Sequence, residues 1–139
     1  MAKVYIVCPV RKLTEPEKEL ILKSVADLEK AGHEVRCPFR DTNQVDEIGL
    51  RIVGDHEDDI IWADEVRVWW NPTSEGSLWD FAQYRMAKRF MPEKKLLIIN
   101  LDGVTITEHK SYSNVLLATH FKLNPVHTLA DLKWMKDQS

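Results

Sequence analysis

The residues best suited to chemistry lie in one segment, 69–80, which reads WWNPTSEGSLWD. This pattern is typical of the end of a buried strand, a short polar loop and the start of a helix. The first N–H groups of a helix lack intrahelical partners and carry the positive end of its dipole, so they bind anions. Ser74 adds a hydroxyl, Gly76 a flexible backbone and Asp80 a carboxylate. The segment therefore favours a phosphorylated substrate with an electrophilic carbon near the carboxylate.

The composition of the 139-residue chain limits its class. A hydrophobic content of 44% is enough for a single domain, 1–139, with a continuous core. The formal net charge of −3 and the lack of a basic stripe argue against nucleic acid polymers and anionic membranes as partners. No apolar run approaches the ~18 residues that span a bilayer. Cys8 and Cys37 lie in apolar, strand-like segments, as buried thiols of a reducing compartment do, so we expect a cytoplasmic protein.

Strand and helix patterns alternate along the chain. Thr14–Glu17 forms a capping box with an early proline, which predicts the start of the first helix. The second predicted helix is interrupted near Gly49 and Gly54. Apolar runs predict strands over 4–8, 34–37, 66–70 and 96–99, and helical spacing predicts helices over 14–32, 45–63, 78–90, 113–120 and 129–136.

This alternation implies a parallel sheet with right-handed crossovers. We expect an α/β fold, a single-domain three-layer sandwich of flavodoxin-like or Rossmann-like type with a parallel sheet of about five strands. In the common strand order 2-1-3-4-5, ligands bind outside the carboxyl ends of strands one and three, where the direction of winding reverses. The loops that follow these two strands are 9–12 and 71–76. The topology therefore brings Arg11 towards Ser74 and Asp80.

Three segments resemble the nucleoside 2-deoxyribosyltransferase superfamily, which includes the 2′-deoxynucleoside 5′-phosphate N-hydrolases. They are 3–7 (KVYIV), 60–66 (IIWADEV) and 74–80 (SEGSLWD), in the order and spacing of that family. In the family, a helical glutamate after the polar loop attacks the anomeric carbon of the sugar. The resemblance places Asp80 at this glutamate and Tyr5 at a tyrosine of the first strand. It implies an N-glycosidase or deoxyribosyltransferase-like enzyme in which Asp80 and Tyr5 are catalytic.

Two departures from the family pattern bear on the substrate. Asp80 is one methylene shorter than the usual glutamate. Ser74 stands where the transferases typically carry an aspartate, and is similar to the serine with which the nucleotide hydrolases hold the 5′-phosphate. Arg11 lies in a segment similar to the hydrolases' phosphate loop. The resemblance therefore implies a 2′-deoxynucleoside 5′-monophosphate, bound by Arg11, Ser74, Gly76 and Ser77.

Cleavage of an N-glycosidic bond also needs a second group. The sugar gains oxocarbenium character that a carboxylate stabilises or traps, and the departing base needs an acid. Candidates lie in the run 55–59 (DHEDD), where His56 is nearest the family's usual offset and is flanked by Asp55 and Asp58. The choice among these three stays open. No second histidine or cysteine stands at ligand spacing, so we expect neither a metal nor a cofactor.

Each of these residues also has a purely structural interpretation. Ser77 and Asp80 fit a capping box, and Ser74 fits an ordinary loop serine. The run 55–59 is typical of a solvated helix face. Arg11 fits a surface arginine and Tyr5 a core tyrosine. The tryptophans at 62, 69, 70 and 79 are typical of a core or a subunit interface.

The predicted function is cleavage of the N-glycosidic bond of a 2′-deoxynucleoside 5′-monophosphate, by hydrolysis or by transfer to another base. The alternatives are a catalytically weak nucleotide-binding or sensing module, a nucleoside deoxyribosyltransferase proper, and a structural domain. The expected partner is a small nucleotide or nucleoside. The resemblance also implies a homodimer or higher homo-oligomer in which a neighbouring subunit closes the site. Residues 111–114 are those that we expect to cross over.

Overall fold

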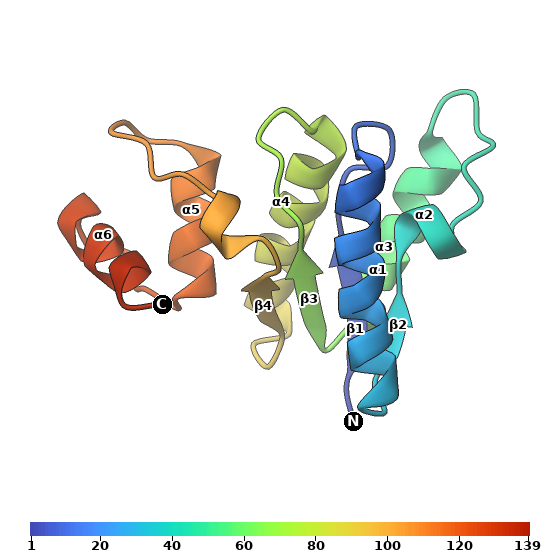
Figure 1. Ribbon diagram of the computed structural model, residues 1–139, viewed down its shortest axis with the longest axis horizontal. Helices are drawn as coiled ribbons and strands as arrows, with labels where there is room; N and C mark the ends of the chain where they lie inside the picture. The colour runs from blue at the N-terminus through green and yellow to red at the C-terminus, as the bar shows by residue number, and fades with distance from the viewer.

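The computed structural model describes residues 1–139 as alternating strands and helices (Figure 1). None of the helices is both long enough and apolar enough to cross a bilayer. The strands are β1 (Lys3–Val7), β2 (Glu34–Arg36), β3 (Glu65–Val68) and β4 (Lys95–Ile98). The helices are α1 (Glu15–Lys30), α2 (Pro38–Asp41), α3 (Leu50–Trp62), α4 (Glu75–Phe90), α5 (Tyr112–His120) and α6 (Leu129–Asp137), with a 3-10 turn η1 (Leu101–Gly103).

All four strands are parallel, in the order β2-β1-β3-β4. This order confirms the predicted α/β, flavodoxin-like class, with the reversal of winding between β1 and β3. There Tyr5 pairs with Val66 and Val7 with Val68. The sheet has four strands and not the five expected. The segment after α5, 121–128, has no apolar run and contains a proline, so it turns into α6 and adds nothing to β4.

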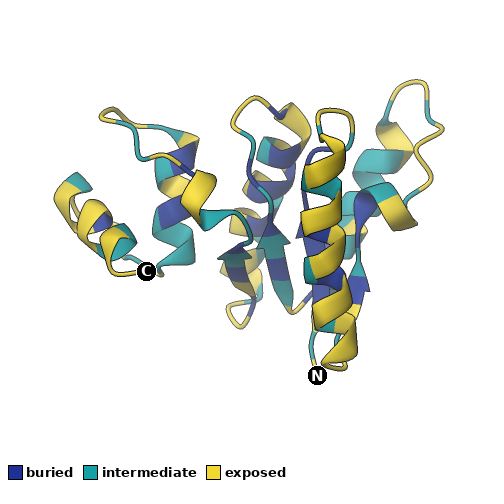
Figure 2. Cartoon of the chain, viewed as in Figure 1, coloured by how far each residue is buried: buried dark blue, intermediate teal, exposed yellow.

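The core lies on both faces of the sheet, as the predicted three-layer sandwich requires. Along β1, Val4 and Ile6 point to the face covered by α1, while Tyr5 and Val7 point to the face covered by α3 and α4. All four side chains are fully buried. Figure 2 shows this buried central strand between helices with exposed outer faces. A strand buried on both faces explains why residues 4–8 read as a continuous apolar run.

Two helix boundaries differ from the prediction. The helix expected from 45 begins at Leu50 and runs through Gly54 without interruption. Gly49 lies just before this helix with φ of 91°, so it ends the preceding loop in the left-handed region. Helix α2 was not predicted, because its four residues are too few to show helical periodicity. The capping box at Thr14 is confirmed.

Two glycines of this region should respond in opposite ways to alanine. Gly49→Ala should lower the free energy of unfolding by about 1 kcal/mol, because a Cβ is unfavourable at positive φ. Gly54→Ala should raise it by about 0.5 to 1 kcal/mol, because alanine is the better helix former and an added Cβ meets nothing within 4 Å. Urea denaturation of both variants checks this. Equal stability of the two variants would contradict it.

Candidate active site

Helix α4 begins at Glu75, three residues before its predicted start at 78. Ser74 is its N-cap: the Ser74 hydroxyl accepts a hydrogen bond from the Ser77 N–H at 3.2 Å and donates one to the Ser77 hydroxyl at 3.0 Å. The capping box of Ser77 with Asp80 is therefore wrong, since Ser77 already lies within the helix. The earlier start places Asp80 in the second turn of α4, away from the helix end.

The side chain of Asp80 is held by two hydrogen-bond donors on other elements. Its Oδ2 accepts a hydrogen bond from the Tyr5 hydroxyl of β1 at 3.3 Å and lies 3.2 Å from Nδ1 of His56 on α3. Asp80 is only 4% exposed. Both partners use the same oxygen, and Oδ1 accepts no hydrogen bond from the protein. The carboxylate is thus fixed through one oxygen, and the other has no hydrogen-bond donor from the protein.

The structure distinguishes the three candidates in the acidic run. His56 faces Asp80, whereas Asp55 pairs with Arg51 at 2.6 Å, one turn earlier on α3. Asp58 is exposed and has no ion pair. Successive residues of a helix point about 100° apart, so Asp55 and Asp58 both point well away from the direction in which His56 faces α4. The structure brings His56 together with Tyr5 and Asp80, and leaves Asp55 and Asp58 outside the group.

Two further residues beside His56 were not predicted. Asp59 lies one turn after His56 on the same side of α3 and pairs with Arg36 of β2 at 2.8 Å. The guanidinium of Arg36 also lies 3.9 Å from the ring centroid of Trp62. The i,i+3 spacing of His56 and Asp59 was the only signal in the sequence. The pairing with Arg36 depends on the packing of α3 against the sheet.

Burial and charge both act on the pKa values of this group. Burial lowers the pKa of His56, but its hydrogen bond to Asp80 and the charges of Asp80, Asp59 and Asp55 outweigh burial and raise it above its ordinary 6.5. Burial, followed by the charge of Asp80, raises the pKa of Tyr5 well above its ordinary 10.0. Tyr5 is therefore a hydrogen-bond donor at neutral pH. Nε2 of His56 is buried without a partner.

The two predicted crevice loops meet through Lys12 instead of Arg11. The Lys12 ammonium donates a hydrogen bond to the Thr73 carbonyl at 2.7 Å. Arg11 is exposed and makes no hydrogen bond within the protein. The N–H groups of Glu75 and Gly76, at the start of α4, have no intrahelical partner. Gly76 lies in the helix, not in a flexible loop, and has open space where a Cβ would be.

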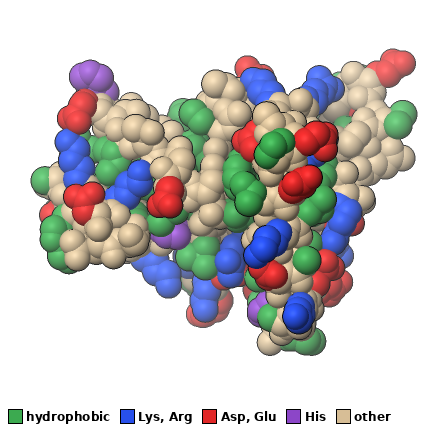
Figure 3. Space-filling view, viewed as in Figure 1, with side chains coloured by type: hydrophobic (Ala, Val, Ile, Leu, Met, Phe, Trp, Pro, Cys, Tyr) green, Lys and Arg blue, Asp and Glu red, His purple; other side chains and the backbone are tan.

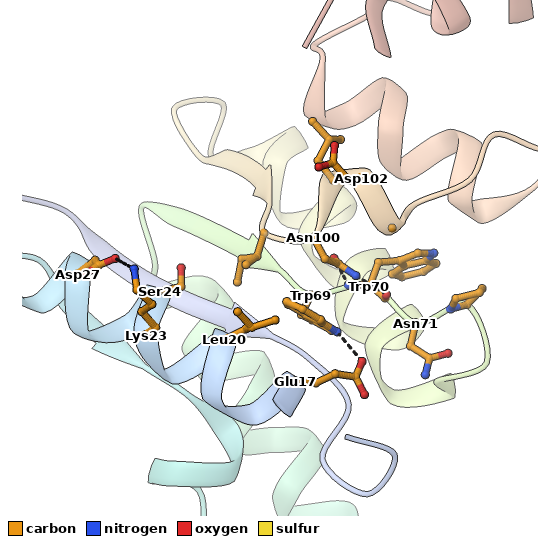
Figure 4. Close-up of a pocket in the computed structure, with 14 residues that line it drawn as sticks. Glu17, Leu20, Lys23, Ser24, Asp27, Trp69, Trp70, Asn71, Asn100 and Asp102 are labelled. Atoms are coloured by element: carbon orange, nitrogen blue, oxygen red, sulfur yellow. Dashed lines mark hydrogen bonds and ion pairs between the residues drawn. The ribbon is translucent and has the colours of Figure 1, made fainter. Parts of the chain in front are cut away.

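A separate groove of about 790 Å³ lies beside Trp69 and Asn100, next to α1 (Figure 4). Here the indole N–H of Trp69 donates to Glu17 at 3.2 Å. The groove is open because α1 packs mainly on β1 and β2, so the neighbouring part of this sheet face has no helix over it. None of the predicted site residues line it.

The segment expected to cross to a neighbouring subunit is largely tied to its own chain. The Ser113 hydroxyl accepts a hydrogen bond from the indole N–H of Trp70 at 2.9 Å, and both residues are buried. Ser111 caps α5, and the Asn114 amide bonds the backbone of 107 and 109. Tyr112 alone is 63% exposed. Homo-oligomer formation stays a prediction.

The fold and the site define a flavodoxin-like α/β protein with a buried, oriented carboxylate beside its central strands. No protein-family model matches the chain, and no curated protein matches it. A solved structure of the 2-deoxyribosyltransferase from the psychrotolerant bacterium Bacillus psychrosaccharolyticus is similar, with a TM-score of 0.57 and 18% sequence identity. The similarity covers 94% of this chain and 96% of that one. It shows that the two proteins share a fold.

The pair of His56 and Asp80 should make stability depend on pH. Folding raises the pKa of His56 above 6.5, so its stabilisation is fully present below that pH and is lost as the pH rises through the folded-state pKa. The wild type should therefore be more stable than His56→Gln below pH 6.5. This difference in unfolding free energy, measured by urea denaturation, should shrink as the pH rises from 6.5 through the folded-state pKa of His56. His109→Gln, which changes an exposed histidine, should follow the wild type. A pH-independent difference would contradict this.

Proposed function

We propose that this protein cleaves the N-glycosidic bond of a 2′-deoxynucleoside 5′-monophosphate with Asp80 as the nucleophile. The observation that carries the proposal is the Asp80 carboxylate, with Oδ2 held by Tyr5 and His56 and Oδ1 free. A carboxylate of fixed orientation is what attack on an anomeric carbon requires. The shared fold with a 2-deoxyribosyltransferase supports this bond as the target.

The proposed chemistry proceeds in two steps. Oδ1 of Asp80 bonds to the anomeric carbon as the carbon–nitrogen bond breaks, and the bonding electrons leave with the base, which takes up a proton from water. Attack by water on the resulting sugar ester gives hydrolysis, and attack by a second base gives transfer. Tyr5 and His56 act through Asp80 as positioning residues: their contacts with Oδ2 keep the other oxygen turned towards the sugar.

Asp80→Asn should lower base release by about a hundredfold or more, because the amide is a poor nucleophile. Asp80→Glu should keep activity, or raise it if the shorter aspartate limits reach. Asp58→Asn is the matched control, because Asp58 is exposed and unpaired on α3. The measurement is chromatography of free base after incubation with a panel of deoxynucleoside monophosphates and nucleosides.

Each outcome of that assay is informative. Near-normal turnover by Asp80→Asn would show that Asp80 is not the nucleophile. A wild-type protein that releases no base, yet is thermally stabilised by monophosphates, would be a nucleotide-binding module. Failure of both activity and stabilisation would leave a structural role.

The preference for a 5′-monophosphate rests on the start of α4. Ser74 is uncharged, so no carboxylate repels a phosphate there. The N–H groups of Glu75 and Gly76 supply donors at the positive end of the helix dipole. Lys12 is already bound to this loop, and Arg11 on the facing loop is exposed and makes no hydrogen bond within the protein.

Ser74→Asp should weaken monophosphate binding much more than nucleoside binding. Aspartate is as good an N-cap as serine, so the fold is kept while a negative charge is added. We expect KM for the monophosphate to rise by about tenfold or more through charge repulsion. Ser74→Thr keeps the cap without the charge and is the control. Arg11→Ala should act in the same direction more weakly. Equal cleavage of nucleosides and monophosphates by the wild type would instead favour a nucleoside deoxyribosyltransferase.

A further inference from the structure

A pocket lined by charged side chains lies at the carboxyl end of α4, the opposite end of the helix from Ser74. Its volume is about 460 Å³. Six cationic side chains line it against a single carboxylate, that of Glu93. Figure 3 shows Lys and Arg side chains along the lower edge of the molecule, in the region where Figure 1 places the turn that leads into β4. The cations are Arg85, Lys88, Arg89, Lys94, Lys95 and Lys122, and we call this group the basic pocket.

No cation of the basic pocket forms an ion pair. Elsewhere on the chain, ion pairs are common: Arg36 pairs with Asp59 and Arg40 with Glu29, both at 2.8 Å. This difference does not come from a shortage of acids, since the chain carries 22 Asp and Glu against 19 Lys and Arg. The cations of the basic pocket therefore lie close together without the carboxylate partners that cations elsewhere on the surface have.

Part of the basic pocket is explained by local structure. The Lys88 ammonium donates to the carbonyl of Lys94 at 2.6 Å, and the Lys94 ammonium donates to the carbonyl of Ile61 at 2.8 Å. Cations at the end of a helix also complement its dipole. Arg89, Lys95 and Lys122 are exposed and make no side-chain hydrogen bond, so these three are available to a ligand.

Lys122 occupies a position where glycine is expected. It follows α5 with φ of 58°, its N–H bonds the Thr119 carbonyl, and the next N–H, of Leu123, bonds the Ala118 carbonyl at 2.9 Å. This is a Schellman ending, in which the left-handed residue is usually glycine because a Cβ is unfavourable there. It is the only non-glycine residue of the chain at positive φ. The lysine is thus less favourable for the backbone than glycine, but it adds a charge to the pocket.

We propose that the basic pocket binds a small polyphosphate anion, of the kind carried by nucleoside di- and triphosphates. Several free cations around one hollow suit a ligand with several adjacent negative charges. A hollow of this size suits a small molecule. A long nucleic acid would also meet the acidic remainder of a chain of net charge −3, which disfavours it. This binding does not depend on the proposed catalytic function.

Titration calorimetry with inorganic tripolyphosphate at physiological ionic strength tests the proposal. Arg89→Gln and Lys122→Gly should each weaken binding by about tenfold, since each removes one charge-assisted contact. Lys122→Gly should also keep or raise the melting temperature, because it relieves the left-handed residue, so weaker binding cannot be attributed to misfolding. Lys133→Gln, which removes a surface cation outside the pocket, is the matched control and should bind as the wild type does.

Four results would overturn the proposal. Unchanged affinity of Arg89→Gln and Lys122→Gly for tripolyphosphate would show that the anion does not bind in the basic pocket. Equal affinity for orthophosphate and tripolyphosphate would show that the pocket does not select a polyphosphate. Amide shifts confined to residues 73–77 in an NMR titration would place the anion in the candidate active site. Much tighter binding of a single-stranded oligonucleotide would indicate a nucleic acid surface.

Discussion

The burial of the Asp80 carboxylate is the constraint on which the rest of the site depends. A carboxylate removed from water is destabilised by several kcal/mol unless donors replace the water. The donors come from two distant parts of the chain, Tyr5 on β1 and His56 on α3. The three elements must therefore keep their relative positions to within a fraction of a hydrogen-bond length. The ion pair of Arg36 with Asp59, which joins β2 to α3, supports the same arrangement.

Helix α4 organises charge at both of its ends. At its start, backbone N–H groups and the dipole favour an anion, and Ser74 adds no opposing charge. At its end the dipole is negative and would repel an anion, so only side chains can make the region attractive to one. The basic pocket supplies these side chains from α4, from the turn into β4 and from the end of α5. The two ends of one helix are thus proposed to favour an anion for different physical reasons.

Much of the fold was predictable because it is encoded in local periodicity. The continuous apolar run of β1, the capping box at Thr14 and the alternation of strands with helices led to the observed strand order. The errors occurred where local signals compete. Ser74 and Ser77 can both begin a helix, and the structure uses Ser74. Gly54 looked like an interruption, but packing of the rest of α3 keeps the helix continuous.

The sequence by itself determined which residues could do chemistry and that they lie near the carboxyl ends of the first and third strands, because strand order follows from the alternation of elements. The predicted strand order indicated Arg11, Ser74 and Asp80, and the family resemblance added Tyr5. Only the tertiary structure decided that His56, and neither of its acidic neighbours, faces Asp80, and that Lys122 joins a cluster of cations. These choices depend on how each helix is rotated about its own axis. That rotation is set by packing between residues far apart in the chain. The local spacing of residues carries no information about such packing.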